Sequence, residues 1–142
     1  MKTFVPQVDA IERKWYVIDA ADQVLGRVAS RVASILMGKE KAYYTDFLET
    51  GDFVVVVNAG SIRLTGKKWE QKVYRSHSGY PGGLKEITAR DLFQKHPERL
   101  MEYAVRGMLP KTKMGDKLIR KLKVYAGADH PHQAQKPQPL SL

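Results

Sequence analysis

The sequence of 142 residues contains no cysteine, and this absence excludes several kinds of chemistry. The chain forms no disulfide, supplies no thiolate ligand to a zinc ion and carries no cysteine nucleophile. Long hydrophobic runs are missing as well, since the longest, at residues 53–57, has five residues, whereas a membrane-spanning helix needs about 18. The first residues lack the apolar stretch and the cleavage site of a secretory signal. We therefore expect no membrane partner.

The motifs of nucleotide binding and acyl transfer are also absent. The segment from Gly60 to Gly66 and Lys67 is similar to a phosphate loop, but five residues separate its glycines, one too many. In addition, Lys68 stands where that loop needs Ser or Thr. No Gly-x-Gly-x-x-Gly follows the first predicted strand, and no Gly-x-Ser-x-Gly is present. We expect no cofactor and no small-molecule substrate.

The histidines are too few and too scattered to predict a metal site. A zinc site needs three or four ligands at close spacing, and a proline-rich tail is a poor place to hold them. The four histidines are His77, His96, His130 and His132, of which the last two stand in such a tail. We therefore predict no bound metal.

Acidic residues near the predicted strand ends leave one route to an enzyme open. Two of them could meet there as a carboxylate pair for acid and base catalysis. The candidates are Asp19, Asp46, Glu49 and Asp52. We favour ion pairs and helix caps for these residues, because nearby basic residues match many of the acids. We accordingly expect a protein that is not an enzyme and has no catalytic residues.

What the chain does contain is an excess of positive charge. It has 24 Lys and Arg residues against 15 Asp and Glu, a net charge of +9. Residues 1–50 carry seven of each sign, residues 51–105 carry nine basic and six acidic, and residues 106–142 carry eight basic and two acidic. Basic side chains can simply solvate helix faces, but that role does not require acids to be so scarce after Arg106. The charge therefore favours a polyanionic partner.

The hydrophobic pattern predicts a parallel β-α-β unit in the first part of the chain. Residues 15–18 and the unbroken β-branched run at residues 53–57 are typical of strands, the second buried on both faces. Apolar residues recur at helical spacing over residues 24–36, and Gly38 stands where that helix is expected to end. We expect Asp22 to cap the start of the helix.

Shorter elements follow in the remaining sequence. The pattern predicts strands at residues 61–64 and 73–75, a strand or an extended segment at residues 123–125, and helices at residues 89–95, 97–106 and 116–122. Thr88 is expected to cap the first of these helices and Gly107 to end the second, while residues 76–83, rich in glycine, form a loop. Extended arms are predicted at residues 1–13 and 127–142, around a core of residues 14–126. The predicted fold is α/β: one three-layer domain of residues 1–142, with a small, mostly parallel sheet and helices on both faces.

One group of candidate binding residues surrounds the glycine-rich loop. Glycines let backbone N–H groups approach phosphates, lysines supply charge, and Tyr74 or Tyr80 can stack on an unpaired base. The alternative is a flexible hairpin loop with ordinary surface lysines. The candidate residues of this segment are Lys67, Lys68, Lys72, Arg75, His77, Ser78, Gly79, Gly82, Gly83 and Lys85.

A second group lies in the basic last quarter of the chain. Lys113, Lys117, Arg120 and Lys121 recur at a spacing of three or four residues, which predicts that they share one helix face. Like charges on one face repel each other unless an anion neutralises them. The alternative is again a solvated face. The candidate residues of this segment are Arg106, Lys111, Lys113, Lys117, Arg120, Lys121, Lys123 and Tyr125.

The motifs around the basic residues indicate whether the polyanion is DNA or RNA. The sequence shows no helix-turn-helix spacing, no zinc finger and no heptads, the usual devices of DNA-reading proteins. Separate basic surfaces with extended arms at both ends are more typical of a protein that fits into irregularly folded RNA.

Seven stretches of the sequence form a recognisable set in a fixed order. They cover residues 15–20, 25–27, 50–53, 64–68, 78–85, 107–111 and 120–127. The most specific are Gly107-Met108-Leu109-Pro110-Lys111 and Arg120-Lys121-Leu122-Lys123-Val124-Tyr125-Ala126-Gly127. In this set the chain resembles the bacterial-type large-subunit ribosomal protein 13 family over nearly its whole length.

The resemblance implies a three-layer α/β fold without enzymatic activity. It implies binding to large-subunit ribosomal RNA, contact with neighbouring large-subunit ribosomal proteins and an early role in subunit assembly. It also implies a cytoplasmic location, within the large ribosomal subunit. On this interpretation, basic side chains of residues 67–85 and 106–125 neutralise phosphates where RNA helices crowd together.

Overall fold

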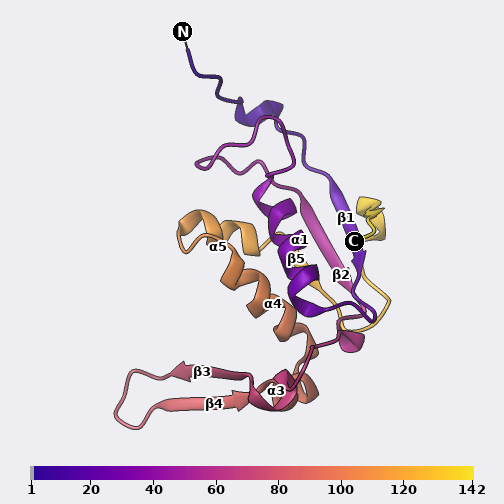
Figure 1. Cartoon of the computed structure of the whole chain (residues 1–142). Coiled ribbons are helices and arrows are strands. Elements are labelled where there is room, and N and C mark those ends of the chain that lie inside the picture. Colours follow the sequence, from indigo (N-terminus) through magenta and orange to yellow (C-terminus); the bar gives the residue numbers. More distant parts are fainter. Residues whose placement is uncertain (1) are drawn as a thin grey trace.

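The main sheet of the computed structural model, which describes residues 2–142, consists of four parallel strands (Figure 1). Their order is β5-β2-β1-β6, with β1 at Trp15–Asp19, β2 at Phe53–Val57, β5 at Leu122–Val124 and β6 at Gln138–Pro139. β1 pairs with β2 along its whole length, from Trp15 opposite Phe53 to Asp19 opposite Val57. The α/β fold class and the strands predicted at residues 15–18 and 53–57 are confirmed, and of the two alternatives for residues 123–125 the strand is present, as β5.

Helix α1, Leu25–Met37, connects β1 to β2 and buries its apolar stripe. Gly38 ends the helix as predicted, with a left-handed φ of 78°, and its N–H donates to the carbonyl of Ile35. The predicted cap at Asp22 is wrong, because Val24 precedes the first turn without a side-chain cap. Instead, the N–H of Leu25 donates to the carbonyl of Arg63 at 3.0 Å, so a distant segment fixes where α1 begins.

That distant segment does not form the strand expected at residues 61–64. It contains a short 3-10 helix at Ala59–Ser61 and a single bridge between Arg63 and Val24. Asn58 enters this turn with a left-handed φ of 58°. The backbone turns away immediately after β2, so no ladder of strand hydrogen bonds can continue there.

The hydrophobic core lies between one face of the sheet and the helices. Ile18, Val54 and Val56 point to this face and are fully buried together with residues of α1 and of α4, Pro97–Met108. The structure differs from the prediction at the opposite face, where the C-terminal segment replaces the expected second helical layer. On that face Trp15 and Phe53 stack with ring centroids 4.5 Å apart, and the ring of His132 lies 5.2 Å from Trp15.

An antiparallel hairpin projects away from the sheet and its helices (Figure 1). It consists of β3, Val73–His77, and β4, Leu84–Thr88, and the short helix α2, Lys68–Gln71, leads into it. The strand at residues 73–75 is therefore confirmed and longer than predicted, while β4 was not predicted. In β4 only Leu84 and Ile87 are large and apolar, and their spacing of three does not match a strand's period of two.

The helices of the second half follow the predictions with shifted ends. Helix α3 spans Ala89–Lys95, and the Thr88 hydroxyl oxygen accepts from the Asp91 N–H at 3.3 Å, which confirms its cap. Helix α4 continues through Gly107 to Met108, and α5 spans Lys113–Ile119 rather than residues 116–122. No helix within residues 2–142 combines the length and the apolar character needed to cross a membrane.

The two arms are less extended than predicted. The N-terminal arm contains a 3-10 turn at Val8–Ala10, and the C-terminal arm contains another at Gln133–Gln135. The C-terminal arm then returns to the sheet as β6, where the Leu140 N–H donates to the Val17 carbonyl at 2.9 Å. Pro139 fits this position because β6 is an edge strand.

Candidate nucleic-acid interface

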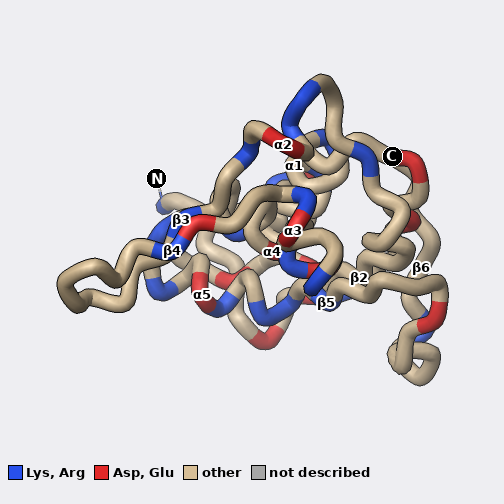
Figure 2. Tube along the Cα trace, turned by 90° about the horizontal axis from the view of Figure 1, so that it is seen from below, with Lys and Arg blue, Asp and Glu red and all other residues tan. Residues whose placement is uncertain are grey.

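The hairpin carries two basic side chains on its strands, and a third stands immediately before β3. Lys72, Arg75 and Lys85 are all exposed. Arg75 pairs with Glu86 of the opposite strand at 2.8 Å, and the Lys72 ammonium lies 5.6 Å from the ring centre of Tyr74. Beyond them the loop is uncharged, and Figure 2 shows this part of the hairpin without a basic or acidic residue. The charge therefore lies along the hairpin's strands and root rather than in the glycine-rich loop.

The loop is a tight turn that holds one aromatic ring outward. Gly83 N–H donates to the Tyr80 carbonyl at 3.0 Å, and Gly82 has a positive φ of 70°. Proline followed by a glycine of positive φ is the pattern of a type II turn. No heavy atom beyond the chain neighbours lies within 4 Å of a Cβ placed on Gly79 or Gly82, so a partner can reach this backbone directly. Tyr80 itself is 76% exposed.

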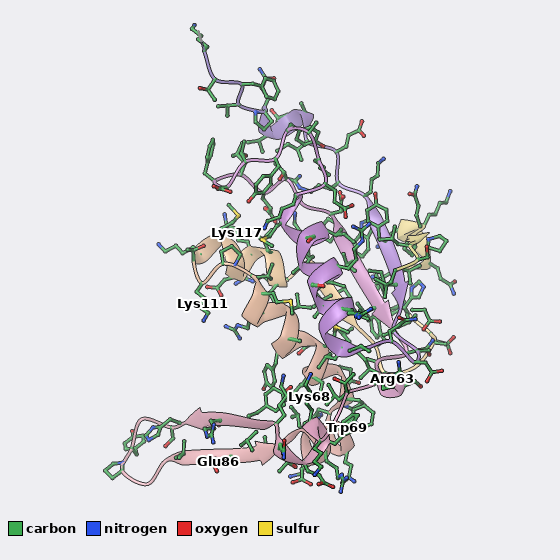
Figure 3. All side chains as sticks on the ribbon, in the orientation of Figure 1. Arg63, Lys68, Trp69, Glu86, Lys111 and Lys117 are labelled. Atoms are coloured by element: carbon green, nitrogen blue, oxygen red, sulfur yellow. The ribbon has the colours of Figure 1, made fainter. Side chains whose placement is uncertain are left out.

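Lys68 lies at the root of the hairpin, at the opposite end from the turn (Figure 3), and Lys67 directly precedes it at the start of α2. Both are exposed, and the Lys68 ammonium donates to the Thr65 hydroxyl at 3.2 Å. Next to them, Trp69 packs edge-on against Phe93 with ring centroids 5.0 Å apart, which fixes α2 against α3. The candidate residues of segment 67–85 are thus spread along the hairpin instead of forming one compact cluster.

The basic residues around α5 form a second surface, here called the α4–α5 patch. Figure 3 shows Lys111 and Lys117 close to each other beside α5. The only acid within this segment is Asp116, which lies 3.9 Å from Arg106. Arg106 and Lys111 line a depression of about 210 Å³ between the two helices. The exposed members of the patch are Arg106, Lys111, Lys113, Lys117 and Arg120.

Lys121 does not belong to that patch, contrary to the prediction of one shared helix face. The side chain is 6% exposed, and its ammonium donates to the Gly51 carbonyl at 3.1 Å and pairs with Glu49 at 3.0 Å. Burial lowers the pKa of Lys121 below its ordinary value, against the opposing effect of Glu49. Helix α5 ends at Ile119, so Lys121 lies between α5 and β5. Its side chain therefore does not share the helix face of Lys113 and Lys117.

Lys123 and Tyr125 also lie apart from the α4–α5 patch. Lys123 stands opposite Val55 in the sheet, which places it on the face away from the helices. The Tyr125 hydroxyl is 2.7 Å from Nε2 of His132. Desolvation, followed by the charges of His130 and Lys123, lowers the pKa of His132. Tyr125 thus ties the C-terminal arm to the sheet, and both Lys123 and Tyr125 are only half-buried.

The acids that could have formed a catalytic pair are each engaged separately. Asp19 accepts hydrogen bonds from the Asn58 amide and the Ala21 N–H, both at 2.9 Å, and these bonds lower its pKa. Tyr44 donates to Asp46 at 2.6 Å. Asp52 pairs with Lys41 at 2.8 Å, and Glu49 pairs with Lys121. Residues 2–142 also contain no group of three or more potential metal ligands.

Sequence reasoning missed a row of residues along α4. Arg99, Tyr103 and Arg106 are exposed and follow one another at spacings of four and three, so they share one face of the helix. Figure 1 shows α4 running from the root of the hairpin toward α5. The row therefore extends from the hairpin side of the molecule to the α4–α5 patch. Its spacing was present in the sequence, but two arginines and one tyrosine alone do not distinguish a binding face from a solvated one.

Comparison with known proteins gives an independent result. Residues 13–131 match the family model described as Ribosomal protein L13. A "Large ribosomal subunit protein uL13" of Thermotoga maritima is 59% identical over 141 residues, 99% of this chain and 95% of that protein. The protein of the same name from Thermosynechococcus vestitus is 59% identical over 142 residues, 100% and 93% of the two chains. That of Syntrophomonas wolfei is 57% identical over 138 residues, 97% and 96%.

Proposed function

The chain belongs to the ribosomal protein L13 family, and from this premise we propose that it is a structural constituent of the large ribosomal subunit. In this role it binds large-subunit ribosomal RNA and touches neighbouring ribosomal proteins, without catalysing a reaction. The curated relatives are named as proteins of that subunit and match nearly the whole chain.

The observation that best supports RNA binding is the α4–α5 patch. It presents five exposed basic side chains, and the only acid of residues 106–125 is Asp116, so like charges repel each other in the free protein. RNA phosphates relieve that repulsion, and their counterions are released on binding, which gives a strong and salt-dependent affinity. A short rigid helix is a suitable support, because its side chains are already positioned when the RNA arrives.

The hairpin supplies a second contact of a different kind. Its strands carry Arg75 and Lys85, and Lys72 stands immediately before β3. The loop offers open backbone at Gly79 and Gly82 and the exposed ring of Tyr80. Stacking on an aromatic ring and backbone contact to phosphate both suit an unpaired, irregular region of RNA. A hairpin that extends from the body can reach between RNA helices that the body itself cannot enter.

A role early in subunit assembly agrees with the packing of the chain. The core between the sheet and α1 and α4 is closed by the chain's own residues, without a partner. The basic surfaces are therefore present before any neighbouring protein is bound. A protein of this kind can bind nascent RNA and hold two of its segments together.

Cosedimentation of the native protein with the large ribosomal subunit tests the proposed function. We expect the full chain to remain with the large subunit through a high-salt wash that strips loosely attached proteins, because the stacking and backbone contacts of the hairpin turn release few counterions and persist when salt weakens the phosphate contacts. Presence only in the soluble fraction, or on the small subunit, would contradict the proposal. Depletion of the protein should in addition cause early precursors of the large subunit to accumulate.

A further inference from the structure

A groove between the hairpin and helices α3 and α4 combines two residues of the first predicted group, Tyr74 and Arg75, with residues of α3 and α4 that neither predicted group includes. It measures about 520 Å³, within the range of small-molecule pockets. Among its lining residues are Tyr74 and Arg75 from β3, Lys95 and His96 from the junction of α3 and α4, and Arg99 and Tyr103 from α4. We propose that this groove holds one unpaired nucleotide of the bound RNA, with its base on Tyr103 and its phosphate near Arg99. This inference rests on the proposed function.

The inner part of the groove suits the face of a base. Ile87 and Leu92 provide apolar surface, and the rings of Tyr74 and Tyr103 lie 5.6 Å apart with an interplanar angle of 37°. Tyr103 is 42% exposed, so part of its ring is free to contact a ligand. Every base has a flat π-face that can stack on such a ring, and apolar neighbours exclude water from the contact.

The Tyr74 hydroxyl beside the groove lacks a hydrogen-bond partner in the described part of the protein. It is buried, and no hydrogen-bond partner lies within reach among residues 2–142. Desolvation raises its pKa, and the neighbouring Tyr103 adds to that effect. Buried polar groups are nearly always paired, so this hydroxyl beside the groove is a polar group for which residues 2–142 themselves supply no partner.

The rim of the groove is cationic. Lys95 and Arg99 are exposed, and within residues 2–142 neither has a carboxylate within 4.0 Å. Arg75 is the exception, since it pairs with Glu86 across the hairpin. A groove with an aromatic interior and unpaired cations at its mouth matches the two halves of a nucleotide, a flat base and an anionic phosphate.

Continuity along α4 favours a single strand of RNA over other occupants. Arg99, Tyr103 and Arg106 lie on one face of the helix, with Glu102 as the one acid among them, so a mostly basic and aromatic surface connects the groove to the depression beside Lys111. A strand held at the α4–α5 patch can therefore continue into the groove. Bases of an A-form duplex are stacked and paired, so only an unstacked base can enter and use the ring.

Paired substitutions at Tyr103 test the proposal directly. With full-length protein and large-subunit ribosomal RNA as the probe, Tyr103→Leu should weaken binding about tenfold, within the range measured for the loss of one stacked base. The dependence of affinity on salt should not change, because stacking releases no counterions. Tyr103→Phe keeps the ring and should bind like the wild type. Arg99→Gln should both weaken binding and lower the slope of log Kd against log salt by about 0.7.

A matched control separates the groove from charge in general. Arg90→Gln removes one exposed positive charge from α3 at a residue that pairs with Glu70, outside the groove. It should leave the RNA affinity nearly unchanged, and circular dichroism should show native folding for all variants. If Tyr103→Leu binds the RNA as tightly as the wild type does, the groove proposal is overturned and the proposed function still stands. If the wild type does not bind the RNA, both proposals fail.

A photo-cross-link identifies the occupant in the assembled subunit. With p-benzoylphenylalanine in place of Tyr103, we expect irradiation of large subunits to give an adduct at an unpaired nucleotide. An adduct to a ribosomal protein, to a paired nucleotide, or no adduct in fully assembled subunits would overturn the proposal. Failure of the variant and of the wild type to enter the subunit would instead contradict the proposed function.

Discussion

Replacing Lys121 by methionine distinguishes a basic side chain that stabilises the fold from one that binds RNA. Lys121 is 6% exposed and holds the loop before β2 through Gly51 and Glu49. Methionine preserves most of the volume but leaves the Gly51 carbonyl without its partner, at a cost of about 1–3 kcal/mol. Removing one member of a fully buried ion pair costs about 3–5 kcal/mol. The Glu49 side chain is 30% exposed and can regain water, so we expect a total near the lower figures.

We therefore expect Lys121→Met to lower the free energy of unfolding by about 2 kcal/mol. For 142 residues the entropy of unfolding is about 0.3 kcal/mol/K, so Tm should fall by about 7 °C in a calorimetric scan. The salt dependence of RNA binding should be unchanged, because the ammonium faces the protein interior. Lys117→Met is the matched control on the α4–α5 patch, and we expect the reverse: a Tm close to the wild type and a smaller salt slope. An unchanged Tm with a reduced salt slope for Lys121→Met would refute the assignment of Lys121 as structural.

Three further predictions follow from particular contacts. Gly51→Ala should destabilise the protein by about 3 kcal/mol in urea titrations, because its Cβ would collide with the Leu36 carbonyl. Gly26→Ala, on the open side of α1, is the control and should stabilise the protein by about 0.5 kcal/mol. Equal effects of the two substitutions would contradict the close approach at residue 51. Tyr74→Phe removes a buried hydroxyl without a partner, so Tm should stay the same or rise, and a clear fall would show that the hydroxyl is hydrogen-bonded after all. The pKa of His132 is lowered in the fold, so the unfolded state takes up the proton first. Stability should be complete above about pH 6.5 and decline as the pH falls through the folded-state pKa, more steeply in the wild type than in His132→Gln, and parallel pH profiles would argue against this interpretation.

The first half of the fold could be predicted because its signals are local. The run at residues 53–57 is β-branched throughout, the apolar spacing of residues 25–36 is helical, and Gly38 provides the left-handed residue that ends the helix. The start of α1 could not be predicted in the same way. It depends on a backbone bond to Arg63, and no capping side chain in the sequence marks the place.

Strand β4 escaped prediction because its partner, not its own pattern, defines it. The two apolar residues of β4 do not alternate, and the strand forms through a register with β3 that the Tyr80–Gly83 turn sets. The C-terminal arm behaves in the same way, since Pro139 discourages a strand assignment and pairing with β1 overrides it. In both places tertiary pairing decides a structure that local propensity leaves open.

In the candidate site, too, some residues could be predicted from the sequence and others only from the fold. Five basic residues of the second group, from Arg106 to Arg120, are exposed as the charge pattern predicted. Lys121 looked identical to them in the sequence, and only a loop 70 residues earlier in the chain makes it a buried residue. The groove at Tyr103 arises where β3, α3 and α4 meet, so no single segment could have predicted it. Charge patterns thus locate a surface, whereas the fold decides which side chains belong to it.

If the exposed residues of the α4–α5 patch bind RNA phosphates, the affinity for RNA depends on salt through those residues. Affinity for large-subunit ribosomal RNA should be measured over a range of salt for the wild type, for Lys113→Ala with Lys117→Ala, and for Lys14→Ala with Lys39→Ala as a charge-matched control. We predict that the patch variant binds more weakly and that its slope of log Kd against log salt falls by about one unit for each phosphate that the variant no longer neutralises. The control should keep the wild-type slope. An unchanged slope for the patch variant would show that Lys113 and Lys117 do not bind RNA phosphates.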